Sequence, residues 1–285
     1  MYKEFYHLKE NPFSVTADPA FFFSSLRHAE AYSNLIYGIK ERKGISVITG
    51  EIGTGKTTLC RTLLNQLGQD VKTALILNPY FSEVQLLQLI IRDLGIPETT
   101  KSKLGLINSL NDFLCAQAVQ GNNVVLIIDE VQHLNVRQLE QVRLLSNLET
   151  EKNKLLQIIL VGQPELLDKL KLPSLRQLNQ RIAVRYHIPP LEKPEIKEYI
   201  HHRLKVASRS NNGRLPIKFS ESAMNAIYLF TRGTPRLINI LCDRILLAGY
   251  VVETYTIDEQ LVHKCARELT QLVPNNEFEA SYAPR

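Results

Sequence analysis

Short runs of aliphatic and β-branched residues alternate with amphipathic stretches through the first two thirds of the chain. These runs lie at residues 45–49, 73–77, 124–128, 156–161 and 184–188. Most of these runs are largely apolar, which is typical of strands buried on both faces of a parallel sheet. Helices must then connect consecutive strands. The pattern predicts an α/β fold in which a five-stranded parallel sheet lies between two layers of helices.

Helical periodicity fills the intervals between these runs. Apolar residues recur every three or four positions over residues 28–42, which predicts a helix that leads into the first strand. Two further amphipathic segments, at 82–94 and 104–119, fall between the second and third strands. That connection is therefore expected to hold two helices.

The strand pattern ends at Pro189-Pro190, and the residues after it show helical spacing alone. The expected helices lie at 193–210, 220–232, 235–251 and 257–272. We therefore predict an α/β domain over residues 31–189 and an all-helical domain, which could act as a lid, over 190–272. Residues 1–30 are rich in aromatics and broken by prolines, so they are expected to form an irregular cap. The polar residues 273–285 are expected to be a disordered tail.

Composition indicates a globular protein but does not identify a binding partner. The chain has 285 residues, of which 44% are hydrophobic and 22% charged, values typical of a globular protein with about two domains. A net charge of +5 permits nucleic acid or anionic lipid as a partner but is too weak to indicate either. Disordered and fibrous architectures are thereby excluded for most of the chain.

Cysteine spacing and hydropathy indicate the compartment. Cys60, Cys115, Cys242 and Cys265 are too far apart for a zinc knuckle, so buried, reduced thiols are expected. The N-terminus lacks a basic segment followed by an apolar run, and no apolar stretch approaches the ~20 residues that span a bilayer. A cytoplasmic protein without direct membrane insertion is expected.

Residues 50–57 match the phosphate-binding pattern GxxxxGK[ST], directly after an apolar run and before a predicted helix. In this pattern, backbone N–H groups wrap the phosphates, Lys56 reaches the β- and γ-phosphates, and the Thr57 hydroxyl ligates Mg²⁺. The sequence therefore predicts ATP and Mg²⁺ as ligands. The expected nucleotide-binding residues here are Gly50, Glu51, Ile52, Gly53, Thr54, Gly55, Lys56, Thr57 and Thr58.

Two carboxylates follow the third apolar run. Asp129 is expected to hold Mg²⁺ through water, and Glu130 is expected to polarise the water that attacks the γ-phosphate. A glutamate directly after the metal-binding aspartate favours a hydrolysing ATPase over a switch GTPase. No NKxD-like guanine-reading tetrad follows a later strand, which also favours ATP.

Further candidates lie near the ends of later elements. Gln163 follows the fourth apolar run and is expected to orient water and the γ-phosphate. Arg181, or alternatively Arg176, lies before the fifth run, where an arginine could reach the γ-phosphate of a neighbouring subunit. Arg236 begins a helix after Gly233-Thr234-Pro235 and is expected to contact the nucleotide. Asn78, after the second run, could hold Glu130 away from water, although Asn-Pro also simply ends strands.

Taken together, these residues resemble an AAA+ ATPase, with Walker A at 50–57, Walker B at 124–130, sensor 1 at Gln163 and sensor 2 at Arg236. The opening residues 5–13, Asp18-Pro19, His28, Tyr37-Gly38 and the run 161–166 resemble more narrowly the ExeA-like family. That family includes ATPases of secretion, pilus and exosortase systems and is similar to the transposition regulators TnsC and MuB. Secretion members add a transmembrane helix and a periplasmic peptidoglycan-binding domain, neither of which this sequence shows.

The resemblance implies an oligomeric ring, expected to be a hexamer, with ATP between the two domains and between neighbouring subunits. It also implies that Asn11 and Phe13 close over the adenine and that Arg181 acts in trans. Two function classes stay open. One is a cytoplasmic motor, recruited to the inner membrane by an envelope-machine protein or a membrane-anchored partner. The other is an ATP-dependent DNA-binding transposition regulator, for which Lys101, Lys103, Lys152 and Lys154 could line a pore.

The N-terminal match favours the first class. A third class, a nucleotide-binding scaffold without turnover, is disfavoured because Glu130 is present.

Overall fold

The computed structural model describes residues 1–77, 82–151, 153–209 and 217–272, and the chain forms two compact units. The first, here called the helical unit, gathers residues 1–25, 52–55 and the chain from Pro189 onward. The second, here called the α/β unit, comprises Leu26–Glu51 and Lys56–Ile188. Asn78, Lys152 and the predicted tail 273–285 lie outside the described residues, so the expectations placed on them stay predictions.

The α/β unit is built on the predicted parallel sheet. Its strands are β1 (Ile45–Gly50), β2 (Val71–Ile76), β3 (Asn123–Ile128), β4 (Gln157–Gly162) and β5 (Ile182–Ile188). They pair in the order β2-β3-β4-β1-β5, and every pair is parallel. All six residues of β1, β3 and β4 are buried, which explains why their sequences are apolar without alternation. The predicted α/β fold class is confirmed.

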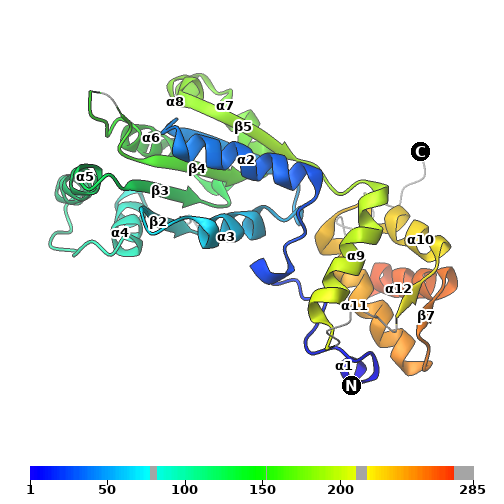
Figure 1. Ribbon diagram of the computed structural model, residues 1–285. Coiled ribbons are helices and arrows are strands. Elements are labelled where there is room, and N and C mark those ends of the chain that lie inside the picture. The colour runs from blue at the N-terminus through cyan, green and yellow to red at the C-terminus, as the bar shows by residue number, and fades with distance from the viewer. Residues whose placement is uncertain (78–81, 152, 210–216, 273–285) are drawn as a thin grey trace. The chain divides into compact units, whose positions relative to one another are not determined.

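Helices cover both faces of this sheet, as Figure 1 shows. They are α2 (Leu26–Lys40), α3 (Lys56–Gln66), α4 (Glu83–Asp93), α5 (Lys103–Val119), α6 (Val136–Leu145), α7 (Glu165–Leu170) and α8 (Arg176–Arg181), with the short turns η2 (Val131–His133) and η3 (Pro173–Leu175). Ser82, Ser102 and Asn135 cap α4, α5 and α6 with side-chain oxygens. The two helices predicted between the second and third strands are therefore α4 and α5.

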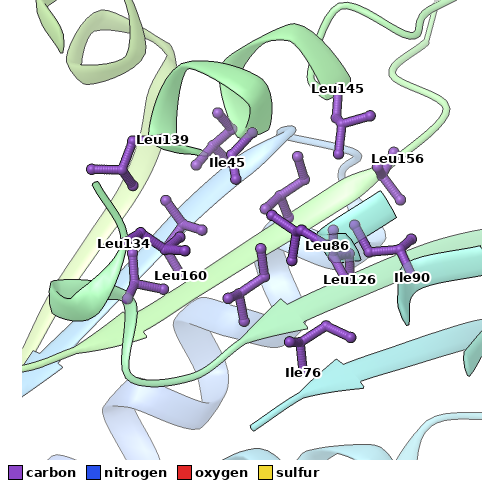
Figure 2. Packing of buried hydrophobic residues seen from close by; sticks show 14 of the residues in the cluster. Ile45, Ile76, Leu86, Ile90, Leu126, Leu134, Leu139, Leu145, Leu156 and Leu160 are labelled. Carbon is purple, nitrogen blue, oxygen red and sulfur yellow. The ribbon is translucent and has the colours of Figure 1, made fainter. Parts of the chain in front are cut away.

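One apolar core fixes the positions of β1, β3 and β4. Leu86 and Ile90 of α4 pack with Leu126 of β3 and Leu160 of β4, and α6 closes the same core with Leu139. Figure 2 shows these side chains converging on one face of the sheet. At about 25 cal/mol per Å² of apolar surface, each such buried leucine or isoleucine contributes roughly 2 kcal/mol to folding. The core therefore holds the carboxyl ends of β1 and β3 on either side of β4.

The helical unit consists mainly of four long helices. These are α9 (Lys193–Ala207), α10 (Glu221–Thr231), α11 (Pro235–Val251) and α12 (Glu259–Leu272), preceded by the short α1 (Tyr2–Phe5) and η1 (Pro19–Phe21). The unit also contains a parallel pair of two-residue strands, β6 (Lys218–Phe219) and β7 (Thr256–Ile257). This strand pair was not predicted from the sequence, because two-residue strands are too short to produce an alternating pattern.

Within the helical unit, a buried arginine holds the N-terminal segment against α9. The Arg203 guanidinium, only 5% exposed, donates to the carbonyls of Pro12 and Ser14 and to the Tyr199 hydroxyl. Its central carbon also lies 4.9 Å from the centre of the Phe21 ring. This arginine therefore ties the chain around residues 12–14 to α9.

Cysteine burial corrects one expectation. Cys60, Cys242 and Cys265 are buried thiols, but Cys115 is exposed. The buried residues of α5 are Leu106, Leu110 and Leu114, so the position after Leu114 turns away from the core. Over the described ranges, no helix combines the length and the apolar character needed to cross a bilayer.

Candidate nucleotide-binding site

The phosphate-binding loop joins the carboxyl end of β1 to the start of α3. Gly53 and Gly55 have φ angles of 78° and 93°, a left-handed conformation that other residues adopt at a cost. A Cβ atom at Gly53 would lie 2.5 Å from the Cβ of Arg236, so the loop has no room for a side chain there. The glycines of the GxxxxGK[ST] pattern are thus required by backbone conformation and by close approach, as a phosphate cradle demands.

Lys56 is buried at the base of this loop, with 6% of its surface exposed. Its ammonium group donates to the carbonyls of Gly50 at 2.7 Å and Glu51 at 2.8 Å. Burial lowers the pKa of Lys56, and the negative charges of Glu130 and Asp129 oppose that shift. The lysine is therefore a cation held within the loop, available to exchange loop carbonyls for phosphate oxygens.

Thr57 and Asp129 bring the two predicted metal ligands together. The Thr57 hydroxyl donates to Oδ2 of Asp129 at 2.5 Å, although the two residues are 72 positions apart. Asp129 is only 2% exposed, and burial raises its pKa while the Thr57 hydrogen bond lowers it. Hydroxyl and carboxylate oxygens are the ligands that Mg²⁺ prefers, so this pair fits a magnesium site.

Glu130 follows Asp129 in a strained backbone conformation with φ of 54°. Its carboxylate accepts a hydrogen bond of 2.5 Å from Nε2 of Gln132. Oε1 of Gln132 in turn accepts from the backbone N–H of Gln163 at 3.0 Å. The structure therefore brings the Glu130 turn and the predicted sensor Gln163 together, with Gln132 between them.

Sequence reasoning missed Gln132. It lies in the short turn η2 rather than at a strand end, and no spacing rule marks it. The only available signal was a glutamine next to an apolar residue, Val131, directly after the acidic pair.

The predicted residues of the helical unit lie as follows. The backbone N–H of Arg236, the second residue of α11, donates to the carbonyl of Gly53 at 3.2 Å, and its side chain is exposed. Phe13 is only 2% exposed and belongs to the core of the helical unit. The Asn11 side chain accepts a hydrogen bond from the Phe13 N–H at 2.9 Å. A role of Asn11 and Phe13 over adenine stays a prediction.

Arg176 and Arg181 are the first and last residues of α8, and both are exposed. Ile182 pairs with Ile45 at the start of β1, whereas the phosphate-binding loop begins at Gly50. The length of β1 separates the two points, or roughly 16 Å at about 3.3 Å per residue. Arg181 therefore lies at the opposite edge of the sheet from its own phosphate-binding loop.

The two arginines line different hollows. Arg181 lies with Lys43 and Lys154 in a hollow of about 360 Å³. Arg176 lies with Lys171 and Arg185 in one of about 550 Å³. Both hollows are therefore basic.

Comparisons with known proteins agree with this geometry. A family model described as an AAA domain matches residues 39–170. The general secretion pathway protein A of Aeromonas hydrophila is 42% identical over 258 residues, which cover 90% of this chain and 46% of that protein. The chain thus spans a little under half the length of this relative.

Solved structures share the fold. The ORC2 protein of Aeropyrum pernix, in ADPNP and ADP complexes, superposes with a TM-score of 0.65 at 18% identity, covering 93% of this chain and 74% of that one. The Cdc6p structure from Pyrobaculum aerophilum gives a TM-score of 0.65 at 19% identity, covering 88% and 70%. A mutant RuvB of Thermotoga maritima gives 0.53 at 18% identity, covering 85% and 69%. At these identities the likeness concerns the fold alone.

The sheet order, the glycine-lined loop and the matched AAA domain confirm the fold of an AAA+ P-loop NTPase, and the similarity over nine tenths of this chain to general secretion pathway protein A agrees with the predicted ExeA-like resemblance.

Proposed function

We propose that this protein binds ATP with Mg²⁺ and hydrolyses it to ADP and phosphate. The observation that carries the proposal is the hydrogen bond between Thr57 and Asp129, with buried Lys56 at the base of the same loop. Two oxygen ligands for a metal ion and one cation, at the end of a glycine-lined loop, suit the phosphates of a nucleoside triphosphate. Glu130, next to Asp129, supplies the carboxylate that hydrolysis requires.

Each residue has a distinct part in the proposed reaction. Lys56 exchanges its contacts with the loop carbonyls for the β- and γ-phosphates and offsets their charge. Glu130 accepts a proton from the attacking water, and Gln163 orients that water against the γ-phosphate. Thr57 and Asp129, whose side chains already meet, would hold Mg²⁺. When bound, the metal neutralises charge that develops on the phosphate oxygens.

The helical unit supplies the other predicted nucleotide contacts. Arg236 is proposed to reach the phosphates, since its backbone already bonds to Gly53 of the loop. Asn11 and Phe13 are proposed to border the adenine.

We further propose that turnover takes place in a ring of subunits. Arg181, at the sheet edge opposite its own phosphate-binding loop, is the proposed trans-acting residue, and Arg176 is the alternative. A ring would place such an arginine at a neighbour's γ-phosphate, an arrangement worth about 10³ to 10⁵ in rate in other systems. Activity would then rise more than linearly with protein concentration.

The cellular role proposed for the ring is assembly of an envelope machine, such as a secretion, pilus or exopolysaccharide system. The support is the relationship to general secretion pathway protein A. The chain covers only 46% of that relative. We therefore propose, by extension, a cytoplasmic location, recruitment to the inner membrane and an envelope-machine partner.

The DNA-binding alternative gains no support from the lysines that were predicted to line a pore. Lys103 forms an ion pair with Glu83, and Lys154 forms one with Glu149.

One experiment tests turnover, assembly and partner class together. ATP hydrolysis is measured against protein concentration, with and without duplex DNA, at two salt concentrations. We expect a specific activity that rises with concentration and is lost in Arg181→Ala, while DNA has no effect. Stimulation by DNA that disappears at high salt would instead support the transposition-type function, and constant activity at all concentrations would contradict the ring.

A further inference from the structure

A single glutamine joins the proposed catalytic carboxylate to Gln163, the residue that follows β4. Gln132 is 8% exposed, and both ends of its amide are bonded. Nε2 donates to Oε2 of Glu130 at 2.5 Å, and Oε1 accepts from the N–H of Gln163 at 3.0 Å. The side chain therefore bridges its own turn to a residue 31 positions further along the sequence.

The orientation of this amide follows from chemistry. The backbone N–H of Gln163 can only donate, so the Gln132 atom that faces it must be the oxygen. The amino group then has to point toward Glu130, where it meets a carboxylate that accepts. Reversing the amide would place two donors together at one end and two acceptors together at the other.

The turn that carries Gln132 is itself held against the segment after β4. Lys169 of α7 donates to the main-chain carbonyl of Gln132 and, at 2.9 Å, to that of Leu134. Gly162, the last residue of β4, lies under the glutamine, and a Cβ atom there would be 2.9 Å from Oε1 of Gln132. Three separate features thus fit the 130–134 turn to the end of β4.

We propose that Gln132 is a positioning residue that fixes the Glu130 carboxylate relative to the end of β4 and so links the water-activating group to the γ-phosphate sensor. The proposal rests on the proposed ATP hydrolysis, in which Glu130 activates water. A displacement of Gln163 on contact with the γ-phosphate moves Oε1 of Gln132, and the rigid amide carries that movement to Glu130. Nothing in this arrangement requires Gln132 to touch the nucleotide.

The test compares turnover with binding in Gln132→Ala and in the isosteric Gln132→Glu. The first removes the bridge, and the second keeps an acceptor for Gln163 but sets a carboxylate against Glu130. A hydrogen bond to a charged group is worth about 1.5–3 kcal/mol, so kcat should fall about 10- to 100-fold in Gln132→Ala. ATP affinity should change less than about twofold.

Two further variants separate positioning from a merely structural role. Gln138→Ala removes another buried glutamine, whose Oε1 accepts from the N–H of Asn135 at the start of α6, and it should leave kcat unchanged. Gly162→Ala keeps the glutamine at position 132 but should still lower kcat, because the added methyl group displaces its Oε1. Thermal melts of all four proteins establish that each is folded, and if Gln132→Ala melts early, Gly162→Ala carries the same comparison.

The decisive readout is a double-mutant cycle in single-turnover hydrolysis, followed over hours to resolve slow rates. If Gln132 acts through Glu130, then Gln132→Ala causes no additional loss in a Glu130→Gln background. An equal fold-loss in both backgrounds, or a folded Gln132→Ala with normal kcat, overturns the proposal. Normal turnover of Glu130→Gln alone would instead refute the proposed function, so the two failures are distinguishable.

Discussion

The Arg203 contacts make a prediction about how the N-terminal segment is held. Replacing Arg203 with methionine keeps most of the side-chain volume but removes the guanidinium. The substitution breaks hydrogen bonds to the carbonyls of Pro12 and Ser14 and to the Tyr199 hydroxyl. It also removes the guanidinium from the Phe21 ring. Each charged hydrogen bond is worth about 1.5–3 kcal/mol, and the ring contact about 1 kcal/mol.

Those terms sum to roughly 5–10 kcal/mol, but burying a guanidinium costs several kcal/mol that methionine does not. The difference predicts a net loss of about 2–4 kcal/mol in the unfolding free energy of the helical unit. Arg244→Met in the same unit is the matched control, because Arg244 makes two hydrogen bonds to Glu268 but is 40% exposed. Such an exposed pair contributes less than about 1 kcal/mol.

The assay is chemical unfolding followed by circular dichroism, together with chymotrypsin digestion of the native proteins. Phe13 and Phe21 are buried in the helical unit and should be cut faster in Arg203→Met than in wild type or Arg244→Met. Arg203→Lys should resemble Arg203→Met, since one ammonium group cannot reproduce the planar guanidinium. If Arg203→Met loses no more stability than Arg244→Met, the arginine does not hold the segment and the reasoning is refuted.

Three other substitutions test the site and the backbone around it. Lys56→Ala should lower ATP affinity about 100-fold, because losing a buried charged donor costs about 3 kcal/mol; unchanged affinity in a nucleotide titration would refute the phosphate-loop assignment. Burial raises the pKa of Asp129, so its charge lowers stability as the pH rises through that pKa. Asp129→Asn should therefore be more stable than wild type near pH 8, and this difference should disappear toward pH 4, as thermal melts at both pH values would show. Gly233→Ala should cost more than about 3 kcal/mol in thermal unfolding, since a Cβ atom would lie 1.9 Å from the Leu191 carbonyl, whereas Gly95→Ala, at a similar φ in open space, should cost only about 1 kcal/mol; equal losses would show that the close approach at Gly233 is relieved.

The sheet could be predicted from the sequence because its physical cause is local. β1, β3 and β4 are buried along their whole length, so each appears as a largely apolar run without polar alternation. The phosphate-binding loop could be predicted because its glycines are needed for backbone conformation at fixed positions, of which Gly53 and Gly55 are examples. These are constraints that a short stretch of sequence expresses by itself.

Other features depend on tertiary proximity and left little local signal. Gln132 can bond to Gln163 because β3 and β4 are neighbouring strands, and the sequence around position 132 does not indicate that pairing. β6 and β7 are each two residues long and pair although a long stretch of chain, including α10 and α11, lies between them. Arg203 did leave a trace, since it falls on the buried face of α9 beside Ile196 and Ile200, and a charge at such a position indicates a buried partner.

The measurement that tests the central claim most directly is a comparison of ATP binding and phosphate release in Glu130→Gln. The substitution replaces one carboxylate oxygen with an amide and leaves Lys56, Thr57 and Asp129 in place. The proposed role of Glu130 as general base predicts ATP affinity within about twofold of wild type and phosphate release slower by at least about 100-fold. A Glu130→Gln protein that binds ATP and still releases phosphate at the wild-type rate would contradict it.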